Sequence, residues 1–200
     1  MMIKRGVIGG LFIGIGGAIY LTLFKEQPIL AAVLFSIALN SIVLTGAKLF
    51  TGSIGFVEHQ QDWEDVVWIL LGNCCDAVVC AILVSATNED MTCVALPLVQ
   101  AKLTKSWAVV FLQAYCCGVL MYTAVRASMS ATDTAGKILI ITFCVTTFIL
   151  SGFEHSIADF FYYMLCIPVA DITWWRAPLF FFAALLGNTL GARTVHRYLI

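Results

Sequence analysis

The feature that most constrains this chain is a succession of apolar runs long enough to cross a bilayer, two of them interrupted by polar, glycine-containing stretches. A transmembrane helix needs about 20 apolar residues. Six segments meet that need, at residues 6–24, 29–57, 65–87, 106–126, 137–170 and 177–196. With 61% apolar and 12% charged residues, the chain cannot cover a water-soluble surface. We therefore expect an all-α protein with six helices embedded in the lipid bilayer.

The few charged residues limit the partners and indicate an orientation. A formal net charge of −1 and the lack of a basic run give no reason to expect a nucleic acid partner. The basic N-terminus leads into a full-length apolar run, which we interpret as a retained first helix rather than a signal peptide. Lys and Arg gather on the cytoplasmic side of membrane proteins, which favours cytoplasmic termini in the plasma membrane. The expected inner set is Lys4, Arg5, Arg126, Lys137, Arg193 and Arg197, against Lys25, Lys102, Lys105 and Arg176 outside.

The second and fifth apolar segments are too long for one straight helix and are interrupted at matching places. The interruptions read LTGAKLFTGS at 44–53 and LSGFEHSIAD at 150–159. Superposing the two places Gly46 on Gly152 and Lys48 on Glu154. Freed backbone survives at membrane depth only where protein buries it or a cavity solvates it. These breaks, which also contain Gly52, therefore predict a path through the protein.

A second repeated motif, LLGN, occurs in the third and sixth segments, at 70–73 and 185–188. Two matches in the same order suggest that the first three helices repeat as the last three. Three spans per repeat would invert the second copy, which is an architecture known from transporters with midplane sites. We expect a single transmembrane domain with a 3+3 inverted repeat, broken helices 2 and 5, repeat one at about 1–88 and repeat two at about 102–200.

The residue types at the breaks are suited to binding an anion. Half-helices that begin at the midplane expose positive dipole ends, and Thr51 and His155 can donate hydrogen bonds there. A buried histidine that merely caps freed carbonyls is the alternative for His155. Lys48 and Glu154 have opposite charges at equivalent positions, so a structural salt bridge and a transport role are both open, because unpaired ions are unstable at this depth. No cofactor or metal ion is expected.

These motifs resemble the formate/nitrite transporter family. LTGAKLFTG is similar to that family's second-helix break and GFEHS to its fifth-helix break, and the Gly-Asn pairs of the LLGN motifs match as well. The resemblance implies an aquaporin-like protomer and a homopentamer with one pore in each protomer. It implies a channel or transporter, not an enzyme, for small monovalent anions such as formate or nitrite. Together with the residues at the breaks, it predicts proton coupling through a central histidine, with the proton relayed by His155 or by water.

The resemblance also implies roles for single residues. Thr51 and His155 would face each other at the pore centre, and Lys102 would attract anions in the outer vestibule. Apolar constrictions on either side would be formed by Phe35, Leu39, Phe50 and Phe148.

Three departures from the family pattern are Lys48 in place of an acid, Gly118 in place of Asn and Asp159 in place of Asn. No amphipathic helix precedes the first span, so we expect a pore that is constitutively open or gated elsewhere. A hydrosulfide channel of the same family is the main alternative. An intramembrane enzyme using His155 and Glu154 and a purely structural scaffold are more remote.

Overall fold

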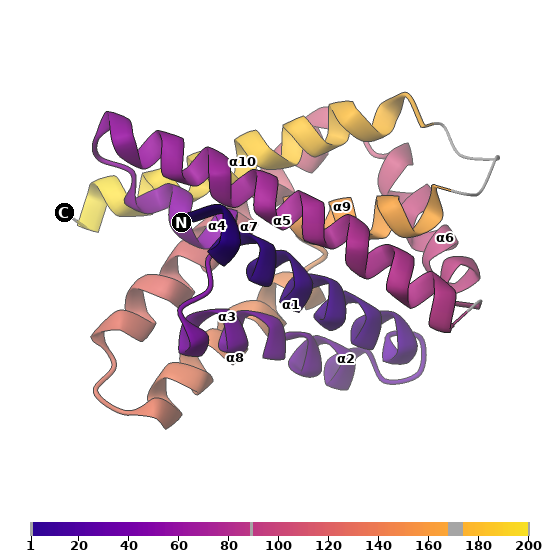
Figure 1. The fold of residues 1–200 in the computed structure, drawn as a ribbon, viewed down its shortest axis with the longest axis horizontal. Helices are drawn as coiled ribbons and strands as arrows, with labels where there is room; N and C mark the ends of the chain where they lie inside the picture. Colours follow the sequence, from indigo (N-terminus) through magenta and orange to yellow (C-terminus); the bar gives the residue numbers. More distant parts are fainter. Residues whose placement is uncertain (1, 89, 168–173, 200) are drawn as a thin grey trace.

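The computed structural model describes residues 2–88, 90–167 and 174–199, and the elements assigned in them are all helical (Figure 1). The elements are α1 Met2–Leu23, α2 Pro28–Phe35, α3 Ile37–Thr45, α4 Phe50–Ser53, the 3₁₀ helix η1 Ile54–Phe56, α5 Gln60–Thr87, α6 Asp90–Thr104, α7 Trp107–Ser130, α8 Thr134–Leu150, α9 Ser156–Cys166 and α10 Arg176–Leu199.

Several of these helices are long and apolar enough to cross a membrane. Four of the described helical segments meet this criterion by length and composition: Met2–Leu23, Pro28–Thr45, Gln60–Thr87 and Trp107–Ser130. α8 and α9 are shorter apolar helices because the fifth predicted span is divided at its break. The end of that span at 168–170, and residues 171–173 of the predicted connection, lie outside the described residues.

Both predicted helix breaks are confirmed. The chain leaves helical geometry between Thr45 and Phe50, and again between Leu150 and Ser156. Gly46 has φ +76° and Gly152 has φ +66°, and no other described residue has a positive φ. Left-handed backbone costs glycine little and disfavours residues with a Cβ. The two glycines therefore let the chain turn out of the helix at matching positions.

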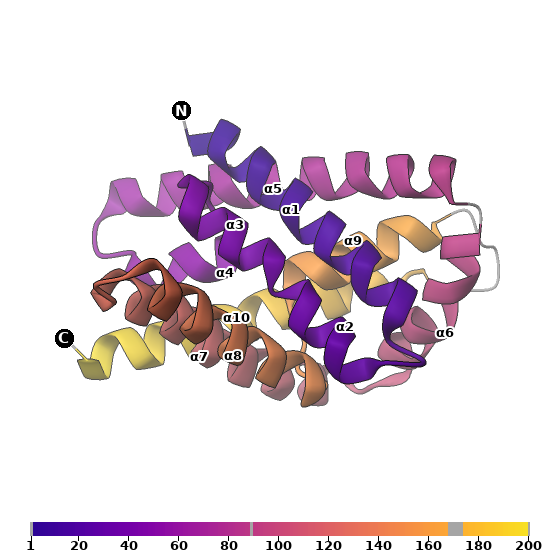
Figure 2. The same cartoon turned by 90° about the horizontal axis from the view of Figure 1, so that it is seen from below.

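The long helices run roughly along one axis of the molecule, and both termini lie at the same end (Figures 1 and 2). We call this the proximal end. The opposite, distal end carries α6 and the turn between α1 and α2. α6 was not predicted as an element, because it is 15 residues long and contains Pro97. It nevertheless positions part of the site described below.

Gly118 lies where α7 and α10 approach each other closely. A Cβ at this position would lie 2.2 Å from the backbone oxygen of Asn188. Atoms of the main chain cannot turn aside as a flexible side chain would. Gly118 thus sets the spacing of α7 and α10, and an Asn would not fit there at this spacing.

We expect Gly118→Ala to destabilise the protein by about 1–3 kcal/mol or more, because overpacking a tight interface forces the backbone apart. Thermal unfolding in detergent would measure the loss. Gly136→Ala is the matched control, because the nearest atoms there belong to the exposed side chain of Asp133. Equal melting of both variants would contradict the close packing.

Candidate functional site

Thr51, in the short helix α4 just after the first break, and His155, at the end of the second break, meet in the core of the protein. Oγ1 of Thr51 lies 2.9 Å from Nε2 of His155, and both side chains are buried. His155 is the N-cap of α9, where its Nδ1 accepts the N–H of Ala158 at 3.2 Å. An accepting Nδ1 carries no proton, so the ring is neutral and Nε2–H donates to Thr51. The hydroxyl proton of Thr51 is then left to bind another acceptor.

Two buried asparagines from the LLGN motifs hold the breaks in place. Asn73 accepts the N–H of Phe50 at 2.9 Å and donates to the carbonyl oxygens of Gly6 and Lys48. Each asparagine therefore ties together a break, the start of a half-helix and a neighbouring helix.

Asn188 repeats this pattern at the other break. It accepts the N–H of Ser156 at 3.0 Å and donates to the carbonyl oxygens of Ala114 and Glu154. The sequence led us to expect that the backbone N–H groups at the half-helix ends would be free to bind an anion. In the structure, two of these groups at the start of α9 already have partners. Asn188 occupies the N–H of Ser156, and His155 occupies that of Ala158. At the start of α9, these two N–H groups are therefore not free to bind an anion.

A cluster of two buried carboxylates and two partly exposed lysines lies on the distal side of His155. Lys102 of α6 contacts Glu154 through Oε2 and Asp159 through Oδ1, the latter at 2.8 Å. Lys105, just after α6, contacts Oε1 of Glu154 at 2.5 Å and Oε1 of Gln113 at 2.8 Å. The carboxylates are nearly inaccessible, with 1% and 4% of their side chains exposed. Such carboxylates are tolerable only because cations pair with them.

The salt bridge considered between Lys48 and Glu154 is wrong. Both carboxylate oxygens of Glu154 are taken by lysines from the distal end. Lys48 lies within the first break instead, and its backbone N–H donates to the carbonyl of Arg5. Positions 48 and 154 match in the two sequence motifs, yet Lys48 is not part of the ion cluster that contains Glu154.

Two cavities approach the Thr51–His155 pair from opposite ends. The distal cavity, about 150 Å³, is lined by Lys102, Lys105, Gly152, His155 and Asp159 among others. The proximal cavity, about 420 Å³, is lined by Gly46, Lys48, Leu49 and Gly52 among others. The pair lies between them, since His155 lines one cavity and the neighbours of Thr51 line the other.

Residues 1–198 match the model of the formate/nitrite transporter family. The chain belongs to the formate/nitrite transporter family. Members of this family are transporters, so the chain is a multi-pass membrane transport protein and not an enzyme. This excludes the intramembrane enzyme that the sequence left open.

Several characterised or named proteins align with most of this chain. The chain is 29% identical to the uncharacterized transporter YrhG of Bacillus subtilis over 95% of this chain and 80% of that protein. It is also 29% identical to the nitrite transporter NirC of Escherichia coli, over 76% of this chain and 63% of NirC. The formate channel BtFdhC of Bacillus thuringiensis is 25% identical over 95% of this chain.

Solved structures of this family share the fold. An FNT family ion channel superposes with a TM-score of 0.91 at 25% identity, covering 100% of this chain and 90% of the other. A pentameric formate channel with formate bound gives a TM-score of 0.88 at 21% identity, covering 99% and 94% of the two chains. The latter likeness concerns the fold alone.

The four residues expected to constrict a family pore do not lie together. Phe35 and Phe148 line the distal cavity with ring centroids 6.2 Å apart, and the Phe148 ring stacks on His155 at 5.7 Å. Leu39, one turn further along, lines the proximal cavity. Two of the expected residues therefore flank the central pair from the distal side and one from the proximal side.

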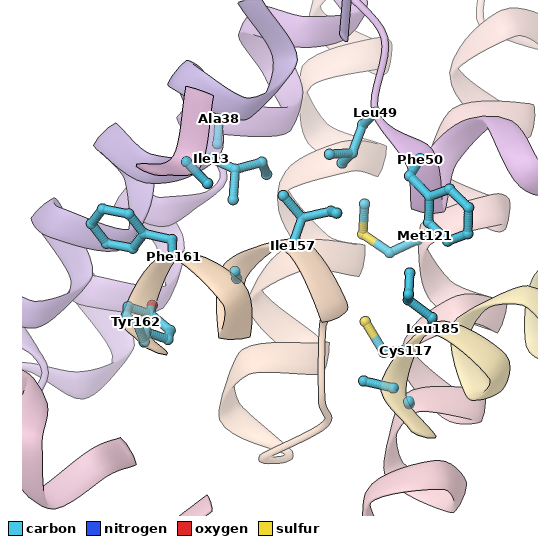
Figure 3. Close-up of a cluster of buried hydrophobic side chains, with 14 of the residues drawn as sticks. Ile13, Ala38, Leu49, Phe50, Cys117, Met121, Ile157, Phe161, Tyr162 and Leu185 are labelled. Atoms are coloured by element: carbon cyan, nitrogen blue, oxygen red, sulfur yellow. The ribbon is translucent and has the colours of Figure 1, made fainter. Parts of the chain in front are cut away.

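Phe50 lines neither cavity, contrary to the expectation. Figure 3 shows it in the buried cluster with Leu49 and Met121. Leu49 is extended, with φ −120° and ψ 136°, and successive side chains of an extended segment point to opposite sides. Leu49 therefore faces the proximal cavity in place of Phe50.

The sequence reasoning missed the role of Lys105 and of the two motif asparagines. The sequence analysis used Lys105 only as one of the cations on the outer side. It gave Lys105 no role in the site, because no helix was predicted at 90–104. The LLGN motifs were noticed as a repeat, but a buried Asn has no signature that says which backbone groups it binds. Asp159 was noted as a departure, and the structure pairs it with Lys102.

Proposed function

We propose that this protein is a homopentameric pore for small monovalent anions such as formate or nitrite, with one path through each protomer and with proton coupling that depends on His155. The observation that carries the proposal is the buried Thr51–His155 hydrogen bond between two opposed cavities. A passing anion that displaces this bond would accept from both Nε2–H and the hydroxyl.

We propose that the protomer is one domain with a 3+3 inverted repeat, about 1–88 and 102–200, and cytoplasmic termini in the plasma membrane. The asparagine contacts support this register. Asn73 donates to the carbonyl of Lys48 and accepts the N–H of the residue two positions later, Phe50. Asn188 does the same with Glu154 and Ser156. The two positive-φ glycines have the same spacing.

The transport step follows from dehydration. An anion leaving the distal cavity passes Phe35 and Phe148, where apolar rings replace its water. Desolvation disfavours the charged form, so the anion's affinity for a proton rises there. If His155 gave up its Nε2 proton, Nδ1 would have to gain one and break the bond from Ala158. We therefore propose that His155 holds and polarises the anion while the proton arrives through water from the cavity.

We expect His155→Ala to lower anion flux by about tenfold to a hundredfold, because a hydrogen bond to a charged group contributes about 1.5–3 kcal/mol. Initial rates of formate, nitrite, lactate and hydrosulfide uptake into proteoliposomes at two pH values would measure this. Parent uptake should rise at the lower pH, and the variant should lose that dependence.

The exposed His59→Ala is the matched control and should behave as the parent. Preferential movement of hydrosulfide would favour the alternative cargo. A folded, pentameric parent that moves none of the four anions would overturn the proposed function.

A further inference from the structure

The lysines at the distal cavity are neutralised by their own neighbours. Lys102 and Lys105 together face Glu154 and Asp159, so the four formal charges sum to zero. Glu154 uses both oxygens on these lysines, and Lys102 contacts both carboxylates. The charged side chains of this cluster therefore offer an anion little net positive charge at the distal cavity.

The proximal cavity has the opposite character. Lys48 is the only ionisable residue among the described residues that line it. Within the described part of the chain, no ion pair or side-chain hydrogen bond is formed by its ammonium group. Two further cations, Lys4 and Arg5, line an adjoining cavity that shares Gly46 and Ala47 with the proximal one.

We propose that Lys48 is the anion-collecting residue of this pore, so that monovalent oxyanions such as formate or nitrite gather in the proximal cavity before they reach Thr51 and His155. The inference rests on the proposed function and adds to it the end at which the anion is captured. A cleft lined by one sign of charge with low-dielectric walls concentrates counter-ions. An ammonium also donates strong hydrogen bonds to carboxylate or nitrite oxygens.

In the part of the chain that the structure describes, Lys102 is paired with carboxylates and Lys48 is not, so substituting the two lysines should have different effects. Removing Lys102 leaves buried carboxylates without a cation and should therefore lower the stability of the protein. Removing Lys48 strands no buried partner, so the protein should fold normally and lose only attraction. That attraction acts through solvent at the cavity mouth, and dissolved salt screens it.

The test is the initial rate of tracer formate uptake into proteoliposomes by the parent, Lys48→Met, Lys48→Arg and Lys137→Met, with sodium gluconate setting the ionic strength. At about 10 mM the Debye length is about 30 Å, and at 1 M it is about 3 Å. We expect Lys48→Met to be about three- to tenfold slower than the parent at low salt and equal to it at high salt. Lys48→Arg keeps the charge and should follow the parent throughout.

Lys137→Met removes a charge from the same end of the molecule but from neither cavity lining, and should change little. Equal rates for Lys48→Met and the parent at low salt would overturn the inference and leave the proposed function standing. A loss that persists at 1 M salt and that Lys48→Arg does not restore would show a structural role, and would also overturn it. A parent that moves no formate would overturn the proposed function itself.

Discussion

Lys102→Met is expected to be among the most damaging single substitutions in this protein, costing about 3–5 kcal/mol, because removing one partner of a buried ion pair leaves its counter-charge uncompensated. Here one lysine serves two carboxylates, Glu154 and Asp159. Glu154 keeps Lys105, whereas Asp159 keeps no other cation among the described residues. Recovery of folded oligomer by size exclusion after heating in detergent would measure the loss.

A second substitution makes this prediction specific to the ion cluster. Asp159→Asn in the Lys102→Met background removes the stranded charge and should restore a large part of the lost stability. Asp159→Asn alone leaves Lys102 paired with Glu154 and should be mild. If Lys102→Met melted like the parent, or if the double variant were no better than the single one, the cluster would not carry the stability assigned to it.

Asn188→Leu is expected to cost at least about 3 kcal/mol, because it leaves three buried backbone groups without partners at about 1–3 kcal/mol each. These groups are the N–H of Ser156 and the carbonyls of Ala114 and Glu154. Because they define the second break, the His155 ring should also lose its position. Both the melting temperature and formate uptake should therefore fall.

Asn73→Leu should have a comparable effect, since Asn73 also makes three bonds at the first break. Thr194→Val is the control on the same helix as Asn188. Among the described residues, its hydroxyl binds the carbonyl of Leu190 alone, one turn back in α10. If Asn188→Leu were as mild as Thr194→Val, the breaks would be held by packing and not by the motif asparagines.

The parts of the structure that could be predicted from the sequence are those that depend on the residue types of a short segment. Apolar length indicated the spans, and a glycine followed by polar residues in mid-span indicated both breaks. His155 and Thr51 were recognised because each lies in a break. The repeat of LTG and LSG, and of LLGN, provided the register that the asparagine contacts share.

The parts that could not be predicted depend on which side a residue faces after folding. Lys48 and Glu154 match in the two sequence motifs, yet Lys48 lines the proximal cavity and Glu154 pairs with Lys102 and Lys105. Leu49 and Phe50 are adjacent apolar residues, and only the extended backbone at Leu49 decides which one faces the cavity. α6 is too short and too polar to be recognised as a span, and Pro97 further conceals it.

The short α6 has a consequence for how the chain enters the membrane. Glu154 and Asp159 would each oppose insertion of the fifth span, since an Asp at mid-bilayer costs about 2.5–3.5 kcal/mol even on the insertion scale. The lysines that neutralise them are Lys102 and Lys105. They leave the ribosome about fifty residues before Glu154 and Asp159 do. The counter-charges are thus synthesised before the carboxylates, and α6 packs against α9, which contains Asp159.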